Sequence, residues 1–473
     1  MTSVTTVTDS VVKLFEICST KLKTMQIKQW EDKNLSQFSY GILSDCEKKV
    51  ILVDPSRNPQ PYLDWATENN AQIVGIIETH PHADFISSHL ELQQTTGATI
   101  YTHSLVAPSY THQTFDEGST IELGKIKLTS IHTPGHSPDG ISVLLEHDGR
   151  QKAVFTGDTL FIGDCGRPDL REGAGNLKAK SEDLARQMYH SLRAKLMKLN
   201  DDVLVYPAHG AGTLCGKSLS KENTSTIGKE KQTNWSLQEA TEDEFVKNLL
   251  ADQPFIPAYF PYDVELNRNG AAALEKSIAD VNIKEYTDNG IETSLDQSLW
   301  VVDVRDEKEF KKGHLPHSIN LMENGKFETW LGTLIKPGEK FYLVGDDKQQ
   351  LLQVIERTAS IGYETAIAGA FVTGGGKVKE TEIDVNLFKK NSSDYTIVDV
   401  RNTSEVKEKA IFPNSLNIPL AEIRERVAEI PTDKPIVVHC AGGYRSAAAS
   451  SLVHAQVNGK TPVFDLSEAI KQF

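Results

Sequence analysis

An internal repeat in the C-terminal part of the chain constrains the fold more than any other feature of the sequence. The segments LWVVDVRDEKEFKKGHLPHSINL (299–321) and YTIVDVRNTSEVKEKAIFPNSLNIPL (395–420) share a β-branched run, an Asp-Val-Arg turn, an acidic helical stretch and a Pro-x-Ser-x-Asn segment. Asp303 and Asp399, at matching positions, are 96 residues apart. A second apolar run follows each copy, EKFYLVGDD and KPIVVHCAG. Strands that alternate with helices predict parallel sheets, so we expect two copies of one βα unit of about 95–100 residues.

The chain is long enough for a further domain ahead of this repeat. It has 473 residues, more than a single hydrophobic core usually organises. Its hydrophobic content of 39% and charged content of 24% are typical of globular proteins, and no apolar run reaches the roughly 18 residues of a membrane span. We therefore predict four parts: an extension (1–24), an N-terminal domain (25–270), a first repeat (280–375) and a second repeat (380–473).

Charge, cysteine content and the first residues limit the partners and the compartment. The net charge of −15, without a cluster of lysine or arginine, argues against a nucleic-acid partner. Five widely spaced cysteines, odd in number, are typical of a reducing compartment rather than of a disulfide framework. Residues 1–24 lack the basic start and the apolar stretch of a secretory signal, so we interpret them as a plain extension, with a weak targeting segment as the alternative. We expect a cytoplasmic protein without a membrane partner.

Potential metal ligands follow the predicted strands of the N-terminal domain. The β-branched runs IVGIIETH, IKLTSIHTP, AVFTGD and DVLVYPAH each end at a histidine or an aspartate or beside one. One such histidine is most often a hydrogen-bonded structural residue. Together, at junctions where Gly or Pro lets the backbone converge, these residues predict a metal site along the edge of layered sheets. The candidates are His80, His82, Asp84, His136, Asp158 and His209.

This pattern resembles the metallo-β-lactamase superfamily, and within it the branch of glyoxalase II and the persulfide dioxygenases. The likeness extends from the ligand motifs through TGDTLFIGDCGRPDL (156–170), STIGKEKQTN (225–234) and PAYFPYDVELNRNG (257–270), so it covers roughly residues 25–270. The resemblance implies an α/β fold for this domain, the αββα sandwich of that superfamily.

Residue 85 bears on the choice between two metal arrangements of that family. In its two-metal hydrolases, the second ion is held by the positions of Asp84, the residue after it and His209, while Asp158 bridges both ions. Here the residue after Asp84 is Phe85, which offers no ligand atom. The two-metal alternative stays open all the same, because His82, Asp84 and His209 are present.

The resemblance then implies the mononuclear arrangement of the family, in which His80, His136 and Asp158 hold one ion. Two imidazoles and one carboxylate with other positions open form the facial triad of non-haem Fe(II) oxygenases, whereas zinc favours a closed tetrahedron or an activated water. We expect one Fe(II) per chain, with O₂ as co-substrate. The remaining candidates would orient ligands and substrate: His82, Asp84 and His209.

Two further groups are expected near the substrate. Arg167 and Asp169, in the segment GRPD, are either pocket groups that bind an anionic thiol or an internal salt bridge that shapes the loop. Cys215, six residues beyond His209, is either a small buried residue or one that contacts substrate or changes its redox state. The sequence leaves both choices open.

The second repeat contains a candidate nucleophile. In VVHCAGGYRSAAAS (437–450), Cys440 follows a buried strand, and a glycine loop with Arg445 leads into an Ala-rich helix. Backbone N–H groups at the start of a helix and a nearby arginine stabilise a thiolate and lower the pKa of the cysteine. With four residues between Cys440 and Arg445, the loop resembles that of the rhodanese sulfurtransferases. We therefore predict that both residues are catalytic.

The first repeat lacks this chemistry. Gly345 stands where the second repeat has its cysteine, and Gln350 stands where it has its arginine. Asp346 and Asp347, in the same loop, would repel an anion. We expect an inactive rhodanese-like domain that positions the other two.

The combination resembles proteins in which a persulfide dioxygenase is fused to rhodanese domains. It implies oxidation of a low-molecular-weight persulfide, carried by glutathione, coenzyme A or a similar thiol, to sulfite. Cys440 would transfer sulfane sulfur in a coupled step, either making persulfide for the iron or joining sulfur with sulfite to form thiosulfate. One alternative is a two-metal thioester hydrolase of the glyoxalase II type with a sulfur-carrier domain, and another is a non-enzymatic sulfur carrier or sensor. Superfamily relatives often form dimers or tetramers, so we expect a homo-oligomer.

Overall fold

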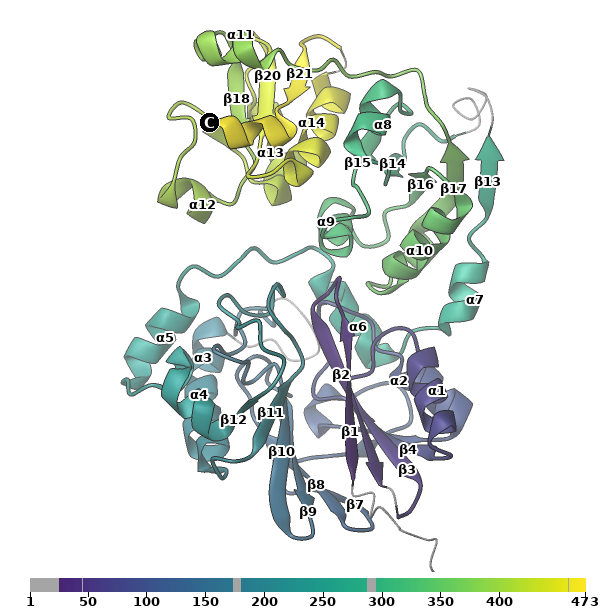
Figure 1. The fold of residues 1–473 in the computed structure, drawn as a ribbon, viewed down its shortest axis with the longest axis vertical. Coiled ribbons are helices and arrows are strands. Elements are labelled where there is room, and N and C mark those ends of the chain that lie inside the picture. Colours follow the sequence, from purple (N-terminus) through teal and green to yellow (C-terminus); the bar gives the residue numbers. More distant parts are fainter. Residues whose placement is uncertain (1–24, 45, 173–179, 287–294, 458) are drawn as a thin grey trace, which may run out of the picture.

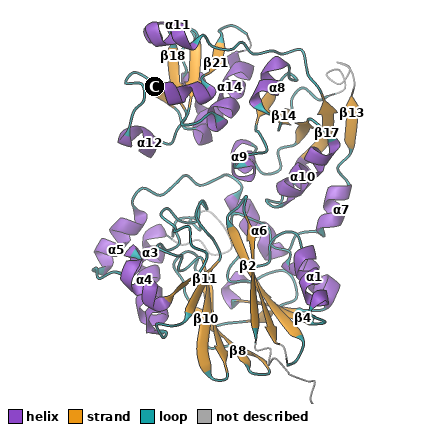
Figure 2. Ribbon diagram, in the orientation of Figure 1, coloured by secondary structure: helices purple, strands orange, loops and turns teal. Residues whose placement is uncertain are grey.

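The chain forms an N-terminal domain with the two repeats side by side above it in Figure 1. The computed structural model describes residues 25–44, 46–172, 180–286, 295–457 and 459–473. The extension predicted at residues 1–24 lies outside these ranges. Each of the three parts is built around its own strands, and helices cover them (Figure 2).

Two six-stranded sheets form the centre of the N-terminal domain. In the first sheet, neighbouring strands from β1 through β3 run antiparallel and those from β3 through β6 run parallel. In the second sheet, all neighbours run antiparallel except β10 and β11. The strands of the first are β1 (Gln26–Asp32), β2 (Gln37–Ser44), β3 (Lys49–Val53), β4 (Gln72–Ile77), β5 (Thr99–Thr102) and β6 (Gln113–Thr114). The strands of the second are β7 (Thr120–Leu123), β8 (Ile126–His132), β9 (Ile141–His147), β10 (Arg150–Gly157), β11 (Leu204–Pro207) and β12 (Ser225–Thr226).

The two sheets pack face to face and bury an apolar core between them. Ile42 and Val53 from the first sheet meet Val143 and Phe155 from the second. Strand β2 is buried along its whole length, and its alternate residues Phe38, Tyr40 and Ile42 all enter this core. Helices pack on the outer faces, so the predicted αββα sandwich is confirmed. These helices are α1 (Gln60–Glu68), α2 (His89–Thr96), α3 (Ser181–His190), α4 (Ile227–Thr233) and α5 (Glu242–Leu250). Two more, α6 (Phe260–Asn269) and α7 (Leu274–Ala279), follow them and contact the first repeat.

Both repeats contain wholly parallel sheets, as the alternation of strands and helices predicts. The first repeat has five strands and the second has four. The first consists of β13 (Ile283–Tyr286), β14 (Trp300–Asp303), α8 (Glu307–Lys312), β15 (Ser318–Asn320), α9 (Phe327–Leu334), β16 (Phe341–Gly345), α10 (Lys348–Ala359) and β17 (Ile367–Thr373). The second consists of α11 (Val385–Lys390), β18 (Thr396–Asp399), α12 (Thr403–Glu408), β19 (Leu416–Asn417), α13 (Ile423–Arg426), β20 (Ile436–His439), α14 (Tyr444–Val457) and β21 (Val463–Asp465).

One hydrophobic core runs from the N-terminal domain into both repeats. It contains Phe85 and Phe260 of the N-terminal domain, Leu331 of the first repeat and Leu452 of the second. Figure 1 shows α6 lying beneath α9 and α10, at the point where this core crosses the boundary. The arrangement of the domains is therefore fixed by burial of apolar side chains. Among the described residues, no helix combines the length and the apolar character that crossing a bilayer needs.

Candidate metal centre and sulfur-transfer loop

The predicted metal ligands of the N-terminal domain lie at one edge of the sandwich, in the loops that follow four strands. The loop after β4 carries three of them, and the loops after β8, β10 and β11 carry one each. All six side chains are buried: His80, His82, Asp84, His136, Asp158 and His209. Buried ionisable groups gathered at strand ends indicate a functional site.

His80, His136 and Asp158 form one group with the geometry of a metal site. One possible ligand atom from each lies within 4.8 Å of the others. Oδ2 of Asp158 is 3.9 Å from Nε2 of His80 and 3.4 Å from Nε2 of His136. This oxygen is buried and accepts no hydrogen bond from the part of the chain that the structure describes. Because a buried carboxylate oxygen without a partner is costly, the three residues fit a cation bound between them.

Hydrogen bonds fix the orientation of both imidazoles. Nδ1 of His136 donates to the carbonyl of Arg167 at 2.8 Å. The Thr79 hydroxyl donates to Asp54, so it accepts from Nδ1 of His80, 3.0 Å away. In each ring this leaves Nε2 with a lone pair that faces Asp158. Burial lowers the pKa of both histidines, which keeps them neutral as metal ligands require.

His209 lies between two carboxylates rather than with this group. Its Nδ1 donates to Oδ1 of Asp158 at 2.8 Å, and its Nε2 lies 2.8 Å from Oδ2 of Asp84. Burial alone would lower the pKa of His209, but the two aspartates outweigh burial and raise that pKa well above its usual value. The second oxygen of Asp158 is therefore occupied, and a bridging role between two ions would require breaking this hydrogen bond.

Cys215 joins this second group. Its sulfur lies within 4.8 Å of ligand atoms of Asp84 and His209. Burial and the nearby carboxylates of Asp84 and Asp158 raise the pKa of the thiol well above its usual value. Cys215 is thus a neutral thiol at the site and not a ready thiolate.

His82 and Phe85 pack against each other beside the two groups. Nε2 of His82 lies 3.2 Å from Oδ1 of Asp54, and the His82 and Phe85 rings are 4.2 Å apart. Asp54 also accepts hydrogen bonds from the backbone N–H and the hydroxyl of Thr79. Our sequence interpretation missed Asp54. The segment VILVDPS could have revealed it, since it is another β-branched run that ends at an aspartate.

Arg167 and Asp169 form the internal salt bridge that was one of their two interpretations. Nε and Nη2 of Arg167 donate to the two carboxylate oxygens of Asp169, both at 2.7 Å. The other N–H groups reach the carbonyls of Leu214, Pro254 and Phe255. All N–H groups of the Arg167 guanidinium are thus bound inside the protein, and none is free for a substrate. Arg167 instead shapes its own loop, whose backbone carbonyl at residue 167 accepts the hydrogen bond from His136.

The loop of the second repeat surrounds Cys440 with hydrogen-bond donors. The N–H groups of Gly443 and Gly442 point at the sulfur, 3.1 and 3.5 Å away. Gly443 has a φ of 109°, which other residues rarely adopt. The guanidinium of Arg445 lies next to this loop and forms a bidentate salt bridge with Glu405 of α12, at 2.6 and 2.9 Å. The sulfur therefore lies in an environment suited to an anion.

The strand registers give the two repeats a common frame. Val344 pairs with Asp303 in the first repeat, and His439 pairs with Asp399 in the second. The following residue is therefore equivalent in both, which places Gly345 where the other loop has its cysteine.

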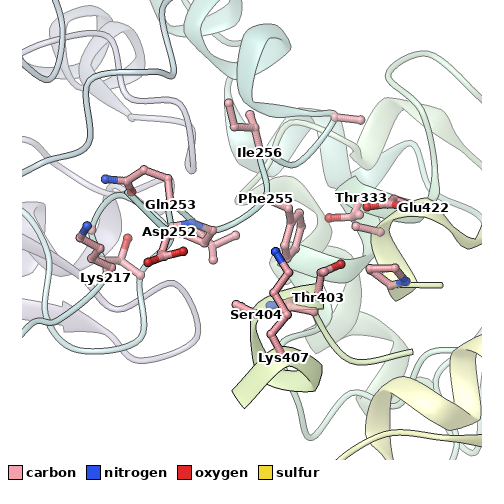
Figure 3. Close-up of a pocket in the computed structure, with 18 of the residues that line it drawn as sticks. Lys217, Asp252, Gln253, Phe255, Ile256, Thr333, Thr403, Ser404, Lys407 and Glu422 are labelled. Atoms are coloured by element: carbon pink, nitrogen blue, oxygen red, sulfur yellow. The ribbon is translucent and has the colours of Figure 1, made fainter. Parts of the chain in front are cut away.

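A cavity of about 750 Å³ lies where the three parts of the chain meet. On one side it is lined by Leu214 and Gly216, the neighbours of Cys215, and on the other by residues of α12. Figure 3 shows Lys217 and Ser404 on opposite sides of this space. The cavity therefore extends from the vicinity of the candidate metal centre to α12, whose Glu405 forms the salt bridge with Arg445.

Comparisons with known proteins agree with this architecture. The family model of the metallo-β-lactamase superfamily matches residues 39–209, and that of the rhodanese-like domain matches residues 285–371 and 384–473. A hydroxyacylglutathione hydrolase of Francisella tularensis subsp. novicida is 32% identical over 191 residues, which are 39% of this chain and 68% of the relative. A mitochondrial persulfide dioxygenase of Homo sapiens is 28% identical over 189 residues, 40% of this chain and 69% of the relative.

A solved structure covers more of the chain. The crystal structure of a metallo-β-lactamase from Staphylococcus aureus subsp. aureus COL shares 31% of its sequence with this chain. The match covers 74% of this chain and 100% of that one, with a TM-score of 0.65. The chain belongs to the metallo-β-lactamase superfamily, and it joins the domain of that superfamily to two rhodanese-like domains.

Proposed function

We propose that this chain is a non-haem Fe(II) persulfide dioxygenase coupled to rhodanese sulfur transfer. The observation that most supports this proposal is the separation of the candidate ligands into two groups. In the first group, Nε2 of His80 and of His136 faces Oδ2 of Asp158, which accepts no hydrogen bond among the described residues. In the second group, His209 already contacts the carboxylates of Asp84 and Asp158. Two imidazoles and one carboxylate with open positions favour one ferrous ion.

The ferrous ion, when bound, supplies a redox-active centre with open positions for dioxygen and a soft sulfur anion. The protein groups keep this centre dry and fixed. His136 is anchored through the Arg167 carbonyl and His80 through Thr79. Phe85 excludes water from the side where a second ion would lie, because its ring is buried against His82.

The proposed reaction is R–S–SH + O₂ + H₂O → R–SH + SO₃²⁻ + 2 H⁺. The S–S bond of the persulfide breaks, its terminal sulfur is oxidised by four electrons, and dioxygen accepts them. Cys215 contacts the substrate as a neutral thiol that donates a hydrogen bond to the sulfur anion. Similarity to a relative named persulfide dioxygenase supports this substrate class.

Cys440 performs the coupled step. Its thiolate attacks the terminal sulfur of a second persulfide, releases R–S⁻ and becomes Cys440–S–S⁻. Sulfite then attacks that terminal sulfur, which gives S₂O₃²⁻ and restores the thiolate. The N–H groups of Gly442 and Gly443 stabilise the anion in both states.

The cavity between the domains suits this sequence of steps. It adjoins Leu214 and Gly216 beside Cys215, and Asn402 at the start of α12. We infer that a small thiol carrier such as glutathione or coenzyme A enters here in a homo-oligomeric, cytoplasmic enzyme.

Oxygen uptake tests the dioxygenase step. Chain purified without added zinc and loaded with Fe(II) should consume oxygen and form sulfite when glutathione persulfide is added, and His136→Ala should abolish both. The matched control is His190→Ala, because His190 is an exposed histidine outside the metal-binding clusters. Absence of oxygen uptake by iron-loaded protein would contradict the proposal.

A thioester hydrolase with two metals is the second candidate. Asp84, His209 and Cys215 are close enough to hold another ion, and one relative is named hydroxyacylglutathione hydrolase. Hydrolysis of S-lactoylglutathione by zinc-loaded protein, without oxygen uptake by iron-loaded protein, would favour it. Sulfur transfer from thiosulfate to cyanide without either activity would instead favour a sulfur carrier or sensor.

A further inference from the structure

A second cluster of metal-binding side chains lies at the boundary between the two repeats. His314 follows α8 of the first repeat, Glu380 lies in the connection between the repeats, and His454 lies on α14 of the second. One ligand atom from each is within 4.8 Å of the others. The two imidazole rings are 6.3 Å apart and nearly perpendicular. Three segments that are distant in sequence therefore place metal-ligand types at one point.

His314 is held in the orientation of a metal ligand. Its Nδ1 donates to the carbonyl of Phe310 at 3.1 Å, and its ring stacks on the Phe310 ring at 3.8 Å. This leaves the lone pair on Nε2, the same arrangement that His136 shows in the N-terminal domain.

The segment that carries Glu380 is fixed by the backbone. His314 and Val378 exchange backbone hydrogen bonds of 2.9 and 3.2 Å. The N–H of Glu380 donates to the carbonyl of Lys311 at 3.1 Å. Oε1 of Glu380 is buried and finds no hydrogen-bond partner among the described residues. A carboxylate oxygen left alone beside two imidazoles is the signature that Asp158 shows at the first metal centre.

The surrounding charges favour a cation at this point. Lys311 is the near cation, but its Nζ lies 3.0 Å from Asp465 and 3.6 Å from Glu307. Lys311 is thus shared among three carboxylates, which leaves Glu380 without a full counterion. A divalent ion would supply one.

The donor set and the location indicate which ion fits and what it would do. Two imidazole nitrogens and one carboxylate oxygen bind divalent transition-metal ions, zinc among them, with a fourth position for water. A cavity of about 520 Å³, lined by both His314 and His454, gives access to the cluster. Helix α14 begins at Tyr444, beside the Cys440 loop, and packs against β15 of the first repeat.

We propose that His314, Glu380 and His454 bind one divalent transition-metal ion of the Zn²⁺ type, and that this ion fastens α14 to the first repeat. The site is separate from the metal centre of the N-terminal domain. It gives the inactive repeat a role, because the ion ties the helix behind the catalytic loop to a fixed partner.

Cobalt binding tests this site. Full-length protein is stripped with a chelator, dialysed against Co²⁺ and analysed for cobalt per chain and for visible d–d absorption. We expect His454→Ala and Glu380→Gln each to bind about one equivalent less than wild type. The matched control is His317→Ala, because His317 lines the same cavity but lies outside the cluster. Its cobalt content should equal that of wild type.

The difference between variants does not depend on how many ions the N-terminal domain holds. His454 is half-buried on a helix and Glu380→Gln is isosteric, so circular dichroism should show that both variants are folded. Equal cobalt content in wild type and both cluster variants would overturn the proposal. So would an equal loss in the His317→Ala control. As a second readout, Zn²⁺ should raise the Tm of wild type more than that of His454→Ala.

Discussion

The two repeats share a framework but differ in the loop that could perform chemistry. In the first, Arg305 forms a buried salt bridge with Asp303 at 2.6 Å, and in the second Arg401 does the same with Asp399 at 2.6 Å. The side chains of the equivalent asparagines, Asn320 and Asn417, donate to the backbone carbonyls of both the Asp and the Arg of each pair. The Asp-Val-Arg motif thus maintains the fold and is no sign of activity.

The difference lies in residues 345–350 of the first repeat and in the equivalent residues 440–445 of the second. In the second repeat, two glycine N–H groups point at the Cys440 sulfur. In the first, the Gln350 side chain accepts from the Asp346 N–H at 2.7 Å, and Asp347 caps α10. The space of the nucleophile is filled and the loop donors are used internally. The first repeat therefore lacks both the cysteine and the free N–H groups that face its sulfur in the second repeat. We infer that the thiol and these N–H groups function together.

The largest expected effect is loss of the nucleophile. Cys440→Ser should reduce sulfur transfer from thiosulfate to cyanide by at least about 10³-fold, because a hydroxyl does not accept sulfane sulfur. Cys46→Ser is the matched control, since Cys46 is an exposed cysteine far from the loop in sequence. Transfer that survives in Cys440→Ser would remove the distinction between the repeats.

Exchange of the loop arginine comes next. Arg445→Gln places the residue of the first repeat in the second and removes the cation beside the persulfide anion. We expect kcat/KM for sulfur transfer to fall about 10²-fold, with a smaller loss in Arg445→Lys. Steady-state kinetics with both variants measures the effect. A full rate in Arg445→Gln would show that the backbone N–H groups suffice.

A smaller effect is expected where the first repeat supports the active loop. The hydroxyl of Tyr444 donates to the Met322 carbonyl at 2.9 Å, and a Cβ added at Gly325 would lie 2.0 Å from the Tyr444 ring. Gly325→Ala should therefore displace Tyr444, slow sulfur transfer a few-fold and lower Tm by about 2–4 °C. The control is Gly374→Ala, where an added Cβ meets nothing within 4 Å. Equal behaviour of both variants would contradict support from the first repeat.

The smallest effect is expected when a cysteine is introduced into the loop of the first repeat. Gly345→Cys in the Cys440→Ser background should restore no sulfur transfer above that background. An added Cβ at residue 345 would lie 2.7 Å from the Gln350 side chain and 3.0 Å from that of Leu351, and Asp346 follows directly. A measurable gain would show that the thiol alone defines the active repeat.

The sequence was sufficient for the parts that depend on local pattern. β-branched runs that end at His or Asp predicted side chains that the structure gathers into candidate metal-binding groups, and the spacing of Cys440 and Arg445 predicted a loop whose N–H groups face the cysteine sulfur. The same signal was present at Asp54 and was overlooked. Strand ends are readable because burial fixes the apolar run and leaves the next residue free for chemistry.

Contacts between domains were beyond the sequence. The Ile86 N–H donates to the Ser360 carbonyl of the first repeat, and Phe85 lies in the core shared with that repeat. Phe85 thus has a packing role that its motif position does not reveal. The choice between two roles for Arg167 also needed the structure, because its carbonyl partners come from segments more than 40 residues away in sequence.

Metal analysis tests the central claim most directly. Protein purified without added zinc should contain about one iron per chain, and anomalous diffraction at the iron edge should place it among His80, His136 and Asp158. Two ions per chain, with Asp158 between them and His209 rotated onto the second, would contradict the account and favour hydrolysis.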